Sequence, residues 1–197
     1  MSLLVTGFEP FGGDPGNPSG DAALLLDGAV VGGQPVHGHC LPCVFASAPQ
    51  RLRDLVDRLQ PALVLCLGLA SSRRGFHAER VAINLIDARI ADNAGAQPVD
   101  LPVHPAGPPA AFSTLPVKRM AAALRAAGFE AQVSYSAGTF VCNQVFHALM
   151  SMPVARAGFL HVGGDLDAAT VAAGVRVALA AALLEHRDIA VSAGRLD

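Results

Sequence analysis

Hydrophobic positions fall into two kinds of segment that alternate along the chain. Short apolar runs of strand length occupy residues 3–6, 36–45, 63–67, 131–135 and 158–162. Several are apolar at successive positions, as in strands that are buried on both faces of a sheet. Between these runs, apolar residues recur at the three- and four-residue spacing of amphipathic helices, at Leu52, Leu55, Val56, Leu59, Val117, Met120, Ala121 and Leu124. A last helix is expected to begin near Asp167.

This alternation predicts an α/β sandwich with a mostly parallel central sheet. Residues 1–197 contain no repeat or linker, which predicts a single domain. Two stretches, residues 7–19 and 71–109, are rich in proline together with glycine or polar residues and fit no regular element. Loops at the carboxyl ends of strands hold the ligand sites of α/β folds, although a loop of this composition is more often a surface turn.

Composition narrows the classes of function. Hydrophobic residues make up 52% of the chain and charged residues 15%, which excludes a disordered chain. The 14 basic and 16 acidic residues give a net charge of −2, so we expect no nucleic-acid partner and no membrane-binding basic patch. The apolar runs are shorter than the roughly 20 residues of a membrane span, and the first one meets Glu9 and Pro10 without forming a signal peptide. We therefore expect a soluble cytoplasmic protein with reduced cysteines.

Cys142 is the most informative candidate for chemistry. It follows a predicted strand and a turn, and it precedes a helical pattern at Val141, Val145, Ala148 and Leu149. Free N–H groups in the first turn of a helix stabilise a thiolate and can hold a developing oxyanion. The competing interpretation is a buried cysteine that packs as a small hydrophobic residue.

A cysteine nucleophile needs a base and a group that orients the base. His161 follows an apolar run directly, so it is expected at the carboxyl end of a strand, on the rim where Cys142 lies. Glu79 enters another apolar segment beside Arg80. Singly, His161 is more often a hydrogen-bonded structural residue, and Glu79 a surface ion-pair partner of Arg80. Together the three residues form a reaction hypothesis.

The competing feature is the pair Cys40 and Cys43, a C-x-x-C spacing with His37 and His39 before it. Such a pair can be a redox dithiol or half of a zinc site. Its neighbours predict a strand, in which positions three apart face opposite sides, and a second C-x-x-C is absent from the sequence. We therefore expect no metal, and the redox or zinc interpretation stays a minor alternative.

Several blocks of sequence resemble the pyroglutamyl peptidase I (pyrrolidone carboxyl peptidase) family. Residues 4–13 read LVTGFEPFGG, and Asn17-Pro18-Ser19 follows them. Residues 79–98 read ERVAINLIDARIADNAGAQP, residues 136–143 read SAGTFVCN, and residues 158–162 read GFLHV. The blocks keep the family's order and cover most of the chain.

The resemblance implies an intracellular cysteine peptidase that removes an N-terminal pyroglutamyl residue from peptides. By matching position, Cys142 is the nucleophile, His161 the general base and acid, and Glu79 the group that orients the imidazole. Phe8 and Phe11 would sandwich the lactam ring, with Asn17 in the same substrate-binding set. Arg89 would lie near the oxyanion site, together with the Cys142 backbone N–H.

The family also implies a three-layer α/β/α sandwich around a mostly parallel, twisted sheet, often assembled as a homotetramer, with no metal or cofactor. The chain departs from the family pattern at residues 69–73, at residues 163–165 and at His147, where an aromatic residue is common. These departures leave two alternatives open: a related cysteine hydrolase of another small amide or lactam, and a non-catalytic binder that retains the fold.

Overall fold

The strands of the computed structural model, which describes residues 1–194, form a central sheet in the order β2-β3-β1-β4-β9-β5-β8. Its strands are β1 (Leu3–Phe8), β2 (Val30–Val31), β3 (Gln34–Leu41), β4 (Leu63–Ala70), β5 (Phe76–Glu79), β8 (Ala131–Ser134) and β9 (Ala157–Gly163). β3, β1, β4 and β9 run parallel, whereas β5 pairs antiparallel with β9. The short strands β6 (Val81–Ile83) and β7 (Ala110–Phe112) pair outside this sheet.

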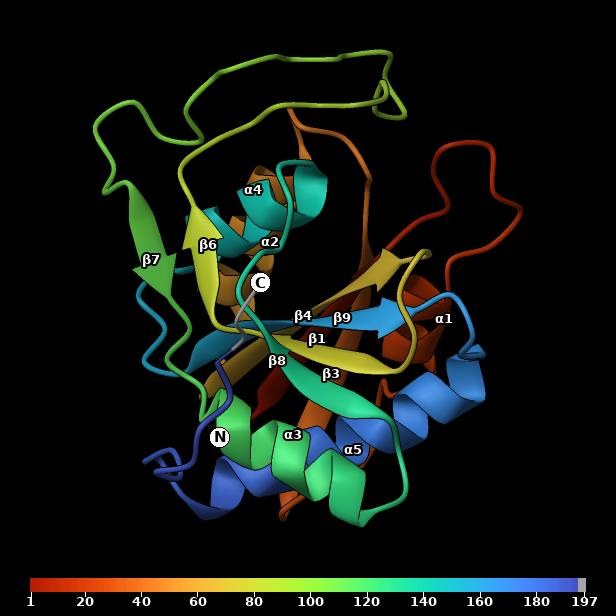
Figure 1. Cartoon of the computed structure of the whole chain (residues 1–197), viewed down its shortest axis with the longest axis vertical. Helices are drawn as coiled ribbons and strands as arrows, with labels where there is room; N and C mark the ends of the chain where they lie inside the picture. The colour runs from red at the N-terminus through yellow and green to blue at the C-terminus, as the bar shows by residue number, and fades with distance from the viewer. Residues whose placement is uncertain (195–197) are drawn as a thin grey trace.

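Helices cover both faces of the sheet, as Figure 1 shows. Their bounds are α1 (Pro18–Leu25), α2 (Ala48–Leu59), α3 (Val117–Ala126), α4 (Val141–Leu149) and α5 (Ala168–Leu184). One core cluster joins α1, α3 and α5 to one face, and a second joins α2 and α4 to the other. The three-layer α/β/α prediction with a mostly parallel sheet is therefore confirmed. The second cluster contains Cys142 and Phe159, so the candidate chemistry belongs to the face under α4.

Two local predictions were wrong. The strand expected over residues 36–45 ends at Leu41, and residues 45–47 form a turn. Residues 71–109 were assigned no regular element, but β5 and β6 lie there. Every residue of β5 is buried, and its sequence is Phe-His-Ala-Glu. The polar His77 and Glu79 hid this strand, because burial of such residues depends on partners that lie far away in the sequence.

Asp92 organises the long segment of residues 84–109, which arches over α2 and α4 in Figure 1. Its carboxylate accepts hydrogen bonds from the backbone N–H groups of Phe45 at 2.8 Å and of Ala94 and Ala96 at 2.9 Å each. Burial alone would raise the pKa of Asp92, but the N–H groups outweigh burial and hold this pKa below its ordinary value. The ionised carboxylate therefore stabilises this segment, which also carries Arg89.

We expect Asp92→Asn to lower the free energy of unfolding by about 2 kcal/mol at pH 7, because hydrogen bonds to a charged acceptor are lost. A lowered pKa in the folded state means that the carboxylate stabilises the fold above its ordinary pKa near 3.9. This stabilisation disappears as the pH falls through the folded-state pKa. Urea unfolding of both proteins from pH 7 downward should show their difference shrinking toward acid. A difference that stays constant with pH would mean that the charge is not responsible.

In the part of the chain that the structure describes, no helix has the length and apolar character needed to cross a membrane.

Candidate active site

His161 and Glu79 meet on neighbouring antiparallel strands. The register of β5 and β9 pairs Glu79 with Phe159, two residues before His161, so both side chains project from the same face. The Nδ1 atom of His161 lies 2.8 Å from Oε1 of Glu79, and Glu79 is 0% exposed. Nη1 of Arg73 lies 3.2 Å from the same oxygen. A carboxylate accepts hydrogen bonds, so we assign Nδ1 of His161 as the donor to Glu79, which leaves the lone pair of the neutral ring on Nε2.

Cys142 occupies the first turn of α4, which begins at Val141 after the extended Phe140. Its thiol lies over Gly68 of β4, a residue that pairs with His161 in the parallel register of β4 and β9. A Cβ atom added at Gly68 would come within 2.8 Å of Sγ of Cys142 and 2.8 Å of Phe159. The missing side chain at Gly68 is thus what allows the thiol to approach the strand beside His161.

Two opposing effects act on the pKa of the Cys142 thiol. Burial raises the pKa of the Cys142 thiol well above its usual range, with contributions from Cys43 and Glu79, and the backbone N–H of the helix start only partly offsets these effects. The helix start thus acts in the expected direction, but burial opposes it and has the larger effect. A neutral thiol must transfer its proton as it reacts, which makes a neighbouring base necessary.

A cavity of about 250 Å³ brings together residues from several parts of the chain. Cys142 and His161 line it, and Phe11, Ile90 and Phe140 form its apolar walls. The other residues of the lining are Leu69, Ala70, Ser71, Ser72, Asp87, Arg89, Ala137 and Thr139. Its volume lies below the range of about 300–1,000 Å³ typical of sites for drug-sized ligands. It therefore suits one small group of a substrate rather than a long side chain.

The predicted substrate-binding residues divide into two groups. Phe11 and the exposed Arg89 line the cavity, and the ring of Phe11 lies 5.9 Å from that of Phe140. Phe8 is 1% exposed and packs in the core, with its ring 6.5 Å from that of Phe159. Asn17 caps α1 and donates to the Glu9 carbonyl, which fixes the loop that carries Phe11. Roles of Phe8 and Asn17 in direct substrate contact stay predictions.

Of the departures from the family pattern, one lines the cavity and a second supports the loop next to it. Residues 69–72 line it, and residues 163–165 brace the loop that follows. Gly163 N donates to the Gly75 carbonyl at 2.7 Å, and Asp165 accepts from Gly75 N at 3.0 Å. His147 is farther away: it is buried in α4, and its Nε2 lies 3.2 Å from the Pro108 carbonyl.

Cys40 and Cys43 lie at the end of β3 and just beyond it, and both are free thiols. Burial raises the pKa of Cys43 to about 12, and it also raises that of Cys40. Among residues 1–194, no group of three or more His, Cys, Asp or Glu side chains is placed to hold a metal ion.

The sequence alone pointed to no role for Arg73, Ser134 or Phe140. Arg73 contacts both Glu79 and Ser134, and Phe140 lines the cavity. The only signal for Arg73 was its place in a stretch that departs from the family pattern, because its partners lie on β5 and β8.

A thiol, an imidazole and a buried carboxylate around one small cavity form the arrangement of a cysteine-dependent hydrolase. The model of the pyroglutamyl peptidase family matches residues 1–181. Pyrrolidone-carboxylate peptidases of Escherichia fergusonii and Streptomyces coelicolor are 45% and 48% identical to the chain. The alignments cover 98% of this chain in both cases, with 98% and 97% of the respective relatives.

Solved structures agree with these relatives. Pyroglutamyl peptidase I from Bacillus amyloliquefaciens superposes with a TM-score of 0.92 at 37% identity, over 95% of this chain and 99% of the other. A mutant pyrrolidone carboxyl peptidase from the hyperthermophile Pyrococcus furiosus gives a TM-score of 0.90 at 36% identity, covering 93% and 99%. The chain belongs to the pyroglutamyl peptidase family.

Proposed function

We propose that the protein is a cysteine peptidase that removes an N-terminal pyroglutamyl residue from peptides, with Cys142, His161 and Glu79 as its catalytic residues. The observation that carries this proposal is the hydrogen bond between His161 and the buried Glu79, on the cavity that Cys142 also lines. Family membership supplies the reaction class, a peptidase. From the arrangement of these side chains we infer the route of each proton.

In the first half of the reaction, Nε2 of His161 takes the Cys142 proton as Sγ attacks the scissile carbonyl carbon. The imidazolium that forms is stabilised by Glu79 through Nδ1–H. The carbonyl oxygen becomes an oxyanion, which the backbone N–H of Cys142 in the first turn of α4 and the Arg89 side chain on the cavity would stabilise. When the tetrahedral intermediate collapses, the C–N bond breaks and His161 protonates the leaving amine, which leaves a thioester on Cys142.

In the second half, water attacks the thioester carbonyl while Nε2 of His161 accepts a proton from it. The new intermediate collapses, the C–S bond breaks, and pyroglutamate is released. His161 then returns the proton to Cys142, which restores the neutral thiol that burial favours. Each proton thus enters and leaves through the same imidazole nitrogen.

The cavity also fits the chemistry of the pyroglutamyl group. Its lactam is flat and neutral and has no free amine, so recognition needs apolar walls and amide partners rather than a carboxylate for an ammonium group. Phe11, Ile90 and Phe140 supply such walls, and Ala137 and Thr139 bring backbone groups to the rim. Among residues 1–194, the lining of the cavity has one acidic residue, Asp87, which is exposed.

We test the proposal with two amides that carry the same fluorogenic leaving group. One is the pyroglutamyl amide, and the other is the prolyl amide, which lacks the lactam carbonyl and carries a charged amine. We expect kcat/KM to favour the pyroglutamyl amide by at least about 10³-fold, because a site built around a neutral lactam rejects the charged analogue. Equal rates for the two amides, or no cleavage of either by the folded reduced protein, would contradict the proposal.

We further propose that the protein acts in the cytoplasm and assembles into a homotetramer. Support for assembly comes from exposed apolar side chains on α1, on α5, which contacts α1, and on or beside β2, which contacts α5; Leu25, Val30 and Leu184 are among them. With 15% charged residues, the chain has little polar cover for such surface. Light scattering at micromolar concentration tests the assembly, and a monomer would contradict it.

A further inference from the structure

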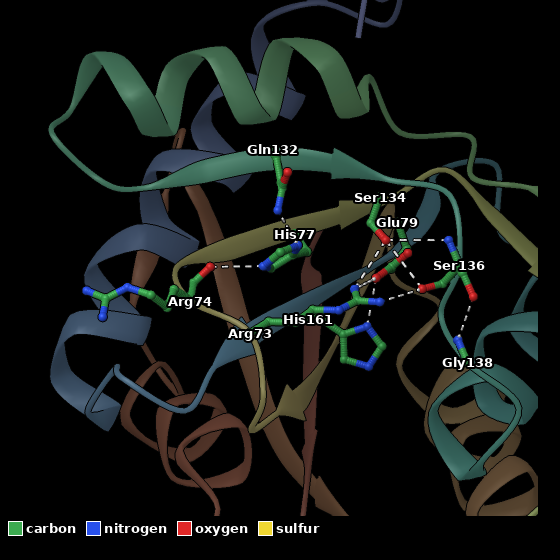
Figure 2. Close-up of polar contacts among 9 residues, drawn as sticks. All are labelled: Arg73, Arg74, His77, Glu79, Gln132, Ser134, Ser136, Gly138 and His161. Atoms are coloured by element: carbon green, nitrogen blue, oxygen red, sulfur yellow. Dashed lines mark hydrogen bonds and ion pairs between the residues drawn. The ribbon is translucent and has the colours of Figure 1, made fainter. Parts of the chain in front are cut away.

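The Arg73 side chain contacts β5, which carries Glu79, and also β8 and the segment that follows β8. Its Nη1 donates to Oε1 of Glu79 at 3.2 Å and to Oγ of Ser134 at 3.2 Å, and its Nη2 donates to the Ser136 carbonyl at 3.1 Å (Figure 2). The same Glu79 oxygen receives the Nδ1–H of His161. One guanidinium therefore joins the carboxylate that orients the base to the segment that leads into α4 and Cys142.

We propose that Arg73 is a positioning residue of this active site, which keeps Glu79 ionised and keeps His161 neutral before substrate binds. This inference rests on the proposed function, because it assigns Arg73 a task in the same reaction. Arg73 touches no reacting atom; it acts through Glu79. Its effect must therefore be visible in the protonation of His161 as well as in the rate.

The charges in the buried site explain the proposed task. With Arg73 in place, Glu79 already has a cation, and a protonated His161 would add an unmatched positive charge to a buried site. Without Arg73, the buried Glu79 would have only His161 as a counterion, so the imidazolium would form at rest. A protonated base cannot accept the Cys142 proton. Arg73 thus keeps the base neutral until the reaction begins. The imidazolium that then forms is balanced by the negative charge of the thiolate and the oxyanion.

Other titratable groups near His161 do not take over this task. His77 on β5 faces Arg73, Glu79 and His161, but burial lowers its pKa, and its ring nitrogens lie against the Arg74 carbonyl and the Gln132 amide. The nearby thiols are Cys142 on α4, Cys66 on β4 and Cys43 beyond β3, and burial raises the pKa of each. His147, also on α4, lies against the Pro108 carbonyl. Asp87 and Arg89 line the cavity and are both exposed. Among these groups, Arg73 is the cation in contact with Glu79.

The backbone of Arg73 is fixed where the loop after β4 lies close to the loop after β9. Arg73 N donates to the Ala70 carbonyl at 2.8 Å, and Gly164 N donates to the Arg73 carbonyl at 3.1 Å. A Cβ atom at Gly163 would lie 2.6 Å from the Arg73 carbonyl oxygen, and one at Gly164 would lie 2.6 Å from that of Ser71. Both glycines belong to the departure at residues 163–165, so this departure permits the contact that places Arg73.

Arg73 also separates Glu79 from water. A larger cavity of about 760 Å³ lies on this side of the site, lined by Arg73, His77, Ser134 and Ser136 among others. The Arg73 side chain is 34% exposed, whereas that of Glu79 is 0% exposed. The guanidinium is therefore the group that lies between the cavity and the carboxylate, and its removal would hydrate Glu79.

The experiment compares Arg73→Gln, Arg73→Lys and Arg74→Gln with the wild type. Arg74 is the matched control, because it is the adjacent arginine but its side chain is 75% exposed and pairs with Glu130 and Asp165 rather than with Glu79. The pH dependence of kcat/KM is measured on the pyroglutamyl amide. The titration of the His161 Cε1 proton by NMR is followed without substrate, so that it reports on Arg73 even if the substrate assignment fails.

For Arg73→Gln we expect the His161 titration and the acidic limb of kcat/KM to move to higher pH by about one unit or more, and kcat/KM at neutral pH to fall about tenfold or more. Arg73→Lys keeps the positive charge but lacks the planar guanidinium, and its His161 titration should lie close to that of the wild type. Arg74→Gln should change neither.

A uniform loss of rate in Arg73→Gln with an unmoved titration would overturn the inference, as would an equal shift in Arg74→Gln. If Arg73→Gln does not fold, Arg73→Met, which keeps an unbranched side chain without the charge, replaces it, and an unmoved His161 titration in Arg73→Met would overturn the inference. If Arg73→Gln shifts the His161 titration as expected but the wild type does not cleave the amide, the result contradicts the proposed function and leaves the role of Arg73 in the protonation of His161 intact.

Discussion

Cys142→Ala should reduce the turnover of the pyroglutamyl amide by at least about 10⁴-fold, because the covalent route disappears with the thiol. The turnover of Cys142→Ser should be reduced by nearly the same factor. The Cys142 thiol is already held neutral by burial, and a serine hydroxyl in the same place is a much weaker acid. Both variants should fold, since residue 142 lies in the first turn of α4, where either side chain is tolerated. Initial rates and thermal unfolding of each variant check both statements.

The matched control is Cys40→Ala, which removes a half-buried thiol that does not line the cavity. Its kcat/KM should equal that of the wild type. A loss of activity in Cys40→Ala comparable with that in Cys142→Ala would show that the nucleophile has been assigned to the wrong cysteine.

His161→Ala should have the second large effect, a loss of at least about 10³-fold in kcat, because the neutral thiol then has no base and the leaving amine has no acid. The deleted ring leaves space on the cavity beside Gly68, so added imidazole should restore part of the rate. The restored rate should rise with pH through the pKa of free imidazole, since only the neutral form accepts the Cys142 proton. Rates across a series of imidazole concentrations and pH values provide the measurement.

His104→Gln serves as the control for His161→Ala, because His104 is exposed on the long segment between β6 and β7. It should keep the wild-type rate and show no response to imidazole. If His161→Ala retained its activity, another group would have to be the base.

The sequence predicted the parts of the site that depend on local pattern. Cys142 was placed at a helix start because a turn precedes an apolar repeat of helical spacing. His161 was placed on a strand because it ends an apolar run. Both placements are confirmed by α4 and β9. Their common rim followed from the parallel order of an α/β sheet, which does not require contacts between specific side chains.

What the sequence did not predict depends on contacts between distant residues. β5 was missed because His77 and Glu79 interrupt its apolar pattern, and Glu79 is buried only through Arg73 and His161. The raised pKa of Cys142 follows from the packing of α4 on the sheet, and a helix start seen in the sequence gives only the opposing effect. Phe8 looked like a loop aromatic, yet it ends β1 and points into the core.

Labelling with a pyroglutamyl chloromethyl ketone tests the central claim most directly, because this reagent combines the proposed substrate group with a trap for the nucleophile. We expect one equivalent to inactivate the protein, with the label on Cys142 in the peptide map, while the prolyl chloromethyl ketone reacts far more slowly. Inactivation with the label on Cys40, Cys43 or Cys66, or equal labelling by both reagents, would contradict the account.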